Sequence, residues 1–293
     1  MIAIDWGTSS FRAYRLAADG RVLDKRSAPL GILNVEPGMF AQVLESQVGD
    51  WLEAAAWPIV MSGMIGSRQG WAEAPYAQCP AGAQEIAAGM REVGWAQHRA
   101  WIVPGLSARD ATGIPDVMRG EEAQIIGVLD RLPAAGAWVC LPGTHSKWAE
   151  VREGKILRFS TYMTGEVFAV MKTHSILGRM MTDGPTDPAW FDAGVRRAHD
   201  AGGLLHHLFG VRARGLFGEV PGASAASYLS GILIGAELIS TGATDGPVYL
   251  LGDPSLVTLY QRALGSFART GIVLDPEAAV RGLHTLAQYL PRS

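Results

Sequence analysis

The sequence predicts an α/β protein with two domains. The chain has 293 residues, about twice the ~150 residues of a typical domain. It contains two similar strand–turn–strand segments, residues 2–23 and 138–157. Short apolar runs alternate with stretches of helical periodicity over the rest of the chain, which is typical of α/β proteins. We therefore expect an N-terminal domain at 1–118 and a C-terminal domain at 119–293, whose last helix packs back on the first domain.

The composition indicates a folded, globular chain. Apolar residues make up 48% and charged residues 18%, below the usual ~25%, so a disordered chain or a coiled coil is excluded. Glycine is abundant, with 36 residues, which favours tight turns and close approach to ligands. The net charge of −3, without a Lys/Arg run, argues against nucleic acid as a partner. Cys79 and Cys140 are too few for a disulfide framework, as expected in a reducing cytoplasm.

We expect neither a membrane span nor a signal peptide. The most apolar stretch, 228–239, is interrupted by Gly231, Gly235 and Glu237 and is shorter than the ~20 residues that a span needs. The first five residues carry an acid and no basic group. The expected location is cytoplasmic. The sequence leaves the oligomeric state open, with a homodimer as one alternative.

The two similar segments predict an internal duplication. Each consists of an apolar strand, a Gly-Thr-x-Ser turn, a second strand, a tight turn and a third strand. Four identities share a separation of 136 positions: Gly7 with Gly143, Thr8 with Thr144, Ser10 with Ser146, and Ala13 with Ala149. The alternative is that any two glycine-containing hairpins look alike, but the shared turn and common length favour duplication.

The two turns have the chemistry of phosphate sites. Glycine allows backbone N–H groups to face a phosphate closely, and Thr and Ser hydroxyls add donors. The copies differ at the end of the first strand, where one carries Asp5 and the other Leu141. Because Mg²⁺ keeps most of its waters, one carboxylate is often enough to hold it beside phosphates. Asp5 is the expected magnesium residue.

The remaining elements follow from periodicity and turn residues. Helices are expected at 37–57, 82–93, 120–129, 163–181, 189–209, 221–238, 256–264 and 276–289. Strands are expected at 59–61, 100–103, 248–251 and 272–274, and a loop at 105–118. Histidines occur at 174, 199, 206 and 207, but adjacent helical residues do not face one ligand, so we expect no histidine metal site.

The loop after the strand at 59–61 is a candidate substrate contact, because ligands of open α/β sheets bind beyond the carboxyl ends of strands. Its residues are Ser62, Gly63 and Met64, with Arg68 and Trp71 just beyond. An ordinary glycine-rich connection is the alternative.

Five motifs together resemble one enzyme family. The segment DWGTSSFR (5–12) resembles the first phosphate motif of the sugar kinase/Hsp70/actin superfamily, and LPGTHSKW (141–148) lies where the second belongs. Together with SGMIGSRQGW (62–71), VMRGEEAQ (117–124) and SYLSGILIGAEL (227–238), they resemble the 2-dehydro-3-deoxygalactonokinase family.

The resemblance implies two actin-like (ribonuclease H-like) domains with an inter-domain cleft, which closes on its ligands. The N-terminal domain would lie on the substrate side and the C-terminal domain on the nucleotide side. The implied activity, part of galactonate and galactose catabolism, is ATP-dependent phosphorylation of 2-dehydro-3-deoxy-D-galactonate to the 6-phosphate, with Mg²⁺. The implied partners are this sugar acid and ATP.

The resemblance also implies nucleotide contacts, which are Gly7, Thr8, Ser9, Gly143, Thr144, His145, Ser146, Lys147 and Gly252. Two alternatives stay open for Lys147: its side chain contacts a phosphate, or it is a solvated strand residue. Gly252 is in the turn that would pack on adenosine, but Asp253 follows it where family members often carry a small residue.

A carboxylate should orient the acceptor hydroxyl, and the segment that begins at Gly120 offers Glu121 and Glu122. Two adjacent acids cannot face the same point, and acids also favour helix N-termini through the helix dipole. We favour Glu121, with Asp110 and Asp116 as reserves.

The carboxylate of a sugar acid calls for a cation far from the γ-phosphate. Arg12 and Arg68 are the candidates, because arginine binds carboxylates in a bidentate manner. The alternatives are surface arginines and a carboxylate held by amides of the 62–67 loop.

Two other functions compete with the kinase. The first is another phosphotransferase of the superfamily, such as an amino-sugar kinase or an exopolyphosphatase. An exopolyphosphatase needs a basic channel for its polyanionic substrate, and the low Lys content argues against such a channel. A non-enzymatic ATP switch is the other, but 293 residues leave no room for a peptide-binding domain.

Overall fold

The computed structural model describes residues 1–53, 57–95, 98–242, 246–275 and 277–291. The chain forms two compact units. The first contains Met1–Gly136, Ala149–Phe159 and Leu274–Ser293, and the second contains Ala137–Trp148 and Ser160–Val273. The units are thus divided after Gly136 instead of Met118. The ranges 1–118 and 119–293 stay a prediction about functional domains.

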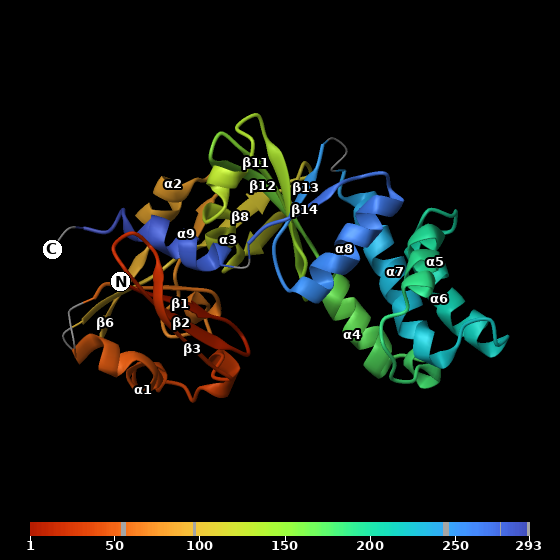
Figure 1. The fold of residues 1–293 in the computed structure, drawn as a ribbon, viewed down its shortest axis with the longest axis horizontal. Helices are drawn as coiled ribbons and strands as arrows, with labels where there is room; N and C mark the ends of the chain where they lie inside the picture. Colours follow the sequence, from red (N-terminus) through yellow and green to blue (C-terminus); the bar gives the residue numbers. More distant parts are fainter. Residues whose placement is uncertain (54–56, 96–97, 243–245, 276, 292–293) are drawn as a thin grey trace. The chain divides into compact units, whose positions relative to one another are not determined.

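The first unit is built on a six-stranded sheet in the order β3-β2-β1-β4-β7-β6 (Figure 1). Its strands are β1 (Ile2–Trp6), β2 (Phe11–Leu16), β3 (Val22–Ala28), β4 (Ile59–Ser62), β6 (Arg91–Trp95) and β7 (His98–Ile102). The first three strands form an antiparallel meander, and β4 lies parallel to β1. A small sheet of β5 (Tyr76–Gln78), β8 (Gly105–Arg109) and β9 (Pro115–Met118) completes the strands.

Helix α1 (Phe40–Glu53) covers this sheet with apolar side chains at helical spacing. Leu44, Val48 and Trp51 are buried in one cluster with Ile4 and Trp6 of β1. The smaller helices of the unit are α2 (Ala83–Ala88), α3 (Glu121–Ile126) and α9 (Ala278–Ala287).

Helices α3 and α9 touch backbone to backbone because glycine lies at their contact. A Cβ atom on Gly282 would lie 1.7 Å from the carbonyl oxygen of Ala123. Helix α9 also contacts β1, so the last helix packs within the first unit.

A five-stranded sheet repeats the strand order of the six-stranded one. It runs β12-β11-β10-β13-β14, which matches β3-β2-β1-β4-β7, and β13 is parallel to β10 as β4 is to β1. The strands are β10 (Ala137–Leu141), β11 (Ser146–Arg152), β12 (Lys155–Tyr162), β13 (Val248–Leu250) and β14 (Gly271–Val273). Most of β11 and β12 lies within Ala149–Phe159, which is grouped with the first unit. The predicted duplication of the strand–turn–strand segment is therefore present, and the α/β class is confirmed.

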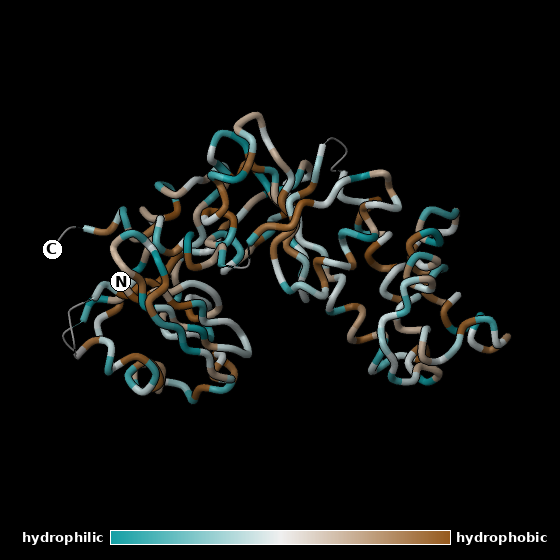
Figure 2. Tube along the Cα trace, viewed as in Figure 1, coloured by the Kyte–Doolittle hydropathy of each residue, from teal (hydrophilic) through white to brown (hydrophobic). Residues whose placement is uncertain are grey.

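The helices of the second unit are α4 (Thr164–His174), α5 (Pro188–Ala198), α6 (Gly203–Leu216), α7 (Gly222–Ser240) and α8 (Pro254–Ser266). By length and composition, α7 is the one helix among the described residues that could cross a membrane, and 67% of the tested stretch is buried within the protein. Buried apolar helices of this kind are common in protein cores. Figure 2 shows hydrophobic stretches distributed through both units.

Several predicted boundaries are corrected. The helix expected at 82–93 ends at Ala88 and is followed by β6, because Gly89 caps it. The expected loop 105–118 contains β8 and β9, and the helix at 163–181 ends at His174. The helix at 189–209 is two helices, since Gly202 (φ +119°) takes a conformation that breaks a helix. Residues 54–56 of the helix expected at 37–57, and the expected helix start at 276, lie outside the described residues.

Candidate active site

Asp5 lies at the carboxyl end of β1, directly opposite Arg12 of β2. Partners in register across an antiparallel pair project to the same face, and Nη1 of Arg12 lies 3.1 Å from Oδ2 of Asp5. Burial raises the pKa of Asp5, while the charge and hydrogen bond of Arg12 oppose this shift. Arg12 thus helps to keep the Asp5 carboxylate ionised.

Two glycines bring further loops against Asp5. Gly63 has φ +94°, and a Cβ atom there would lie 2.7 Å from the carbonyl oxygen of Trp6 and 3.5 Å from Oδ1 of Asp5. Gly120 has φ +108°, and its Cβ would lie 3.3 Å from Cα of Gly63. Glycine allows these close approaches, so the loop after β4 borders the Asp5 carboxylate and the start of α3 borders that loop.

The two glutamates of α3 have different surroundings. Oε2 of Glu121 accepts a hydrogen bond from the Arg119 N–H at 3.0 Å, and Oε2 of Glu122 accepts one from the Gly120 N–H at 2.7 Å. Glu122 is fully buried, and burial, followed by the charge of Glu121, raises its pKa to about 8. Glu121 is partly exposed. At pH 7 Glu122 is therefore mostly protonated, whereas Glu121 is the accessible carboxylate.

Arg119 is a residue that the sequence argument missed, although it stands in the quoted MRGEE segment. Its guanidinium lies over the ring of Tyr76, with Cζ 4.4 Å from the centroid, and Nη2 donates to the Ala74 carbonyl at 2.8 Å. Within the described residues, its buried Nε and Nη1 have no hydrogen-bond partner, and neither have the hydroxyls of Ser62 and Ser67. Unpaired polar atoms thus gather around the 62–67 loop.

Of the predicted substrate contacts, some lie at the sheet edge that carries Asp5 and others lie in the core or on the surface. Ser62 is in register with Asp5, which places it at the same sheet edge. Met64 and Trp71 pack against the apolar core. The Arg68 side chain is 86% exposed and pairs with Glu73 at 3.0 Å, which matches the alternative of a surface arginine.

The first Gly-Thr-x-Ser turn is held by a segment that the sequence analysis did not identify. The carbonyls of Gly7 and Thr8 accept hydrogen bonds from Ile32 and Leu33, and a Cβ atom on Gly31 would lie 2.3 Å from the Ser9 backbone. Thr8 and Ser9 are exposed. Their N–H groups donate to no backbone acceptor among the described residues, as an anion site requires.

The second phosphate turn, 143–146, is fastened to the start of α4. The Thr144 carbonyl accepts a hydrogen bond from the Glu166 N–H at 3.0 Å, and Nε2 of His145 lies 2.5 Å from the Glu166 carboxylate. A Cβ atom on Gly165 would lie 2.4 Å from the Gly143 carbonyl, so the helix approaches the turn through glycine. Thr144 and His145 are exposed at its tip.

Ser146 and Lys147 differ from the expectation for phosphate ligands. The buried Ser146 hydroxyl is hydrogen-bonded to the Tyr260 hydroxyl at 2.8 Å, so it faces the core instead of a phosphate. Lys147 is buried, and Nζ donates to Oγ1 of Thr161 at 2.9 Å. The alternative of a solvated strand residue is therefore wrong.

Gly252 lies beside the second turn, as expected for a nucleotide-binding turn. Its φ is +144°, and a Cβ atom would lie 3.2 Å from the Pro142 carbonyl. The departure at Asp253 has a structural reason, because its carboxylate caps α8 by accepting the Ser255 N–H at 2.9 Å.

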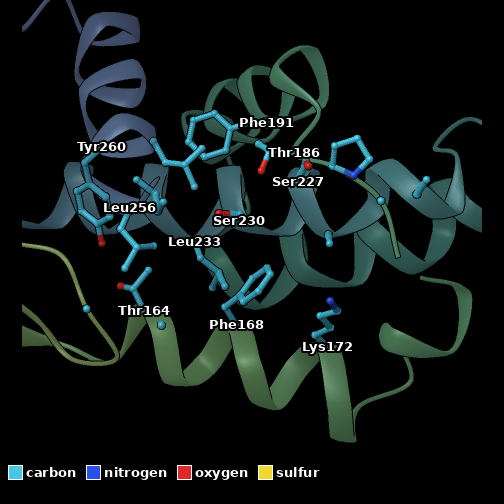
Figure 3. A pocket seen from close by; sticks show the side chains of 18 residues that line it. Thr164, Phe168, Lys172, Thr186, Phe191, Ser227, Ser230, Leu233, Leu256 and Tyr260 are labelled. Atoms are coloured by element: carbon cyan, nitrogen blue, oxygen red, sulfur yellow. The ribbon is translucent and has the colours of Figure 1, made fainter. Parts of the chain in front are cut away.

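A pocket of about 290 Å³ opens beside the second turn. Gly143 and Gly165 border it, and Figure 3 shows Phe168 of α4 and Phe191 of α5 on opposite sides. Leu233 and further apolar residues line it, together with the hydroxyl-bearing Thr164, Thr186, Ser227, Ser230 and Tyr260. Its size and apolar lining suit a planar base.

The metal chemistry of the site depends on Asp5. No group of three or more His, Cys, Asp or Glu side chains arranged for a metal ion occurs within the described parts of the chain. A single partly exposed carboxylate beside the glycine loop after β4 fits a Mg²⁺ ion that keeps its waters and binds phosphate oxygens.

Comparisons with known proteins agree with this geometry. A "Probable 2-dehydro-3-deoxygalactonokinase" of Rhizobium meliloti is 39% identical over 98% of this chain and 96% of its own. The 2-dehydro-3-deoxygalactonokinase of Escherichia coli is 36% identical over 89% of this chain and 88% of its own. A crystal structure of a protein from Sinorhizobium meliloti superposes with a TM-score of 0.90 at 38% identity, covering 98% of both chains. The fold is actin-like. The family model for 2-keto-3-deoxy-galactonokinase matches residues 5–286, and the chain belongs to this family.

Proposed function

We propose that the protein transfers the γ-phosphoryl group of ATP to the 6-hydroxyl of 2-dehydro-3-deoxy-D-galactonate, in galactonate catabolism. The observation that carries the proposal is the Asp5 carboxylate at the end of β1, with Gly63 against it, Gly120 at the start of α3 against Gly63, and the first turn following the same strand. Family membership supplies the substrate class.

The two turns would bind phosphates. We assign this role to the N–H groups of Thr8 and Ser9 in the first unit and of Thr144 and His145 in the second. Asp5 would hold Mg²⁺, which when bound neutralises phosphate charge. Arg12 keeps Asp5 ionised and borders the same edge.

Glu121 would act on the acceptor. As O6 of the sugar acid forms a bond to the γ-phosphorus, the bond from this phosphorus to the oxygen bridging to ADP breaks, and the hydroxyl proton passes to the Glu121 carboxylate. Glu122, neutral at pH 7, would hold the Gly120 N–H and so fix the start of α3.

The function is tested by an assay of ADP release with a panel of 2-keto-3-deoxy acids, hexoses and amino sugars. We expect turnover with the C6 sugar acid of galacto configuration and little with hexoses. Turnover with an amino sugar alone would assign another phosphotransferase activity of the superfamily.

The carboxylate of the substrate gives a second test. Wild type should strongly prefer the keto acid over a neutral analogue, and Arg12→Ala should remove much of this preference. Arg68→Ala is the matched comparison, because its ion pair lies on the surface. Steady-state kinetics with both acceptors measure the preference. If both variants keep it fully, amides of the 62–67 loop hold the acid, and the arginine assignments fail.

The apolar pocket is assigned to the nucleotide base. Ser230→Leu adds bulk to the lining, so it should raise the KM for ATP about tenfold or more, a loss of about 1.4 kcal/mol. The KM for the sugar acid should stay the same. An unchanged KM for ATP would place the base elsewhere.

We also propose that the protein acts in the cytoplasm on small molecules, without nucleic acid or membrane partners. A homodimer is the oligomeric state we propose. Sedimentation at several concentrations checks it, and a monomer throughout would contradict it.

A further inference from the structure

Glu237 is a buried carboxylate on α7 that receives hydrogen bonds from three other elements. Its Oε1 accepts the indole N–H of Trp148 at 2.7 Å, and its Oε2 accepts the hydroxyl of Tyr260 at 2.7 Å. The Thr164 hydroxyl, at the start of α4, also donates to Oε2. An ionised carboxylate accepts only, and a buried charge is costly without such donors, so this set of partners fits a charged Glu237.

The charge fixes the direction of each hydroxyl proton around it. Since the Tyr260 proton points to Glu237, the Tyr260 oxygen accepts the proton of Ser146, whose oxygen is 2.8 Å away. On balance the pKa of Glu237 is raised, because burial outweighs the hydrogen bonds from Thr164, Trp148 and Tyr260, which lower it.

The partners of Glu237 lie at both ends of the second phosphate turn. Ser146 ends the turn and begins β11. Thr164 precedes Gly165, whose backbone lies against Gly143 at the beginning of the turn. Figure 3 shows Thr164 and Tyr260 at the same end of the apolar pocket, whereas Lys172 lies at the other.

We propose that Glu237 is a positioning residue for nucleotide phosphates: its buried carboxylate holds Ser146 and Thr164 so that the turn between residues 143 and 146 keeps the shape that binds them. This inference rests on the proposed function in one respect, namely that the turn binds ATP. Glu237 itself is buried beneath the turn and acts through other residues.

Glu237→Gln tests the proposal because it keeps the shape and removes the charge. The amide N–H₂ group of the variant is a donor, but in wild type the hydroxyls that face this position also donate. The hydrogen bonds of Tyr260 and Ser146 must therefore exchange donor and acceptor. A displacement of the turn by about 1 Å should lower kcat about 10²-fold. The dissociation constant of a non-hydrolysable ATP analogue with Mg²⁺, measured by calorimetry, should rise about tenfold. The KM for the sugar acid should change less than about twofold, because the turn holds the other substrate.

Ser224→Ala is the matched control, since it removes a partly buried hydrogen bond from the same helix, to Asp187 at 2.8 Å. It should lower Tm without changing nucleotide binding. Tyr260→Phe keeps the ring and cuts the connection from Glu237 to Ser146, so it should weaken binding of the analogue in the same direction even if Glu237→Gln does not fold.

The outcomes separate this inference from the proposed function. If wild type binds the analogue and Glu237→Gln and Tyr260→Phe bind it equally well, the positioning role is wrong and the proposed function stands. If Ser224→Ala weakens binding as much as Glu237→Gln does, the effect is general destabilisation and the role is also wrong. If wild type binds no nucleotide, both proposals fail.

Discussion

Asp5→Asn is expected to remove most of the turnover while the protein stays folded. The amide keeps the shape of the carboxylate but loses the charge that would hold Mg²⁺ beside the phosphates. A preorganised electrostatic contact of this kind is typically worth about 10²–10³ in kcat. The lost ion pair with Arg12 is partly exposed, so its effect on stability should be small. Rates at increasing Mg²⁺ concentration measure the effect, and Tm checks the fold.

Asp50→Asn is the control for Asp5→Asn. Asp50, on helix α1 of the same unit, is an exposed carboxylate that forms an ion pair with Arg26 at 2.6 Å. This variant should keep wild-type turnover. Near wild-type turnover of Asp5→Asn at saturating Mg²⁺ would show that Asp5 is not the magnesium residue.

Glu121→Gln should lower kcat by about 10²–10⁴, the usual contribution of a general base, with little change in nucleotide binding. Glu121 is the partly exposed carboxylate of the pair, and its backbone partner, the Arg119 N–H, holds it at the start of α3. Single-turnover kinetics separate the chemical step from product release and so measure the loss directly.

Glu122→Gln is the internal comparison and should affect kcat much less. Glu122 has a pKa of about 8 in the folded protein and an ordinary value near 4.5 when unfolded. Between these values the folded state holds a proton that the unfolded state has lost, so this group makes stability fall as pH rises. Glu122→Gln should flatten that fall in denaturant titrations. A larger loss of kcat in Glu122→Gln than in Glu121→Gln would transfer the base role to Glu122, and no loss in either would transfer it to an aspartate.

Local patterns were sufficient for the fold class and for the positions of the two turns. The Gly-Thr-x-Ser turns each follow an apolar strand, and this arrangement depends on neighbouring residues, so it was predicted correctly in both units. The strand order, in contrast, pairs β1 with β4 and β10 with β13 over long sequence distances. The repeat indicated only that the chain contains the same strand–turn–strand segment twice.

The sequence alone determined the family, the α/β class, the duplication and the candidate residues Asp5, Glu121 and Glu122. Tertiary structure alone decided how these groups are surrounded. Glu122 is neutral because it is buried, and Arg12 faces Asp5 because the strands are in register. Likewise Glu237, an isolated acid in an apolar stretch, becomes the centre of a hydrogen-bond network only through packing. The physical reason is that burial and hydrogen-bond partners come from residues far apart in the chain, which spacing and composition do not encode.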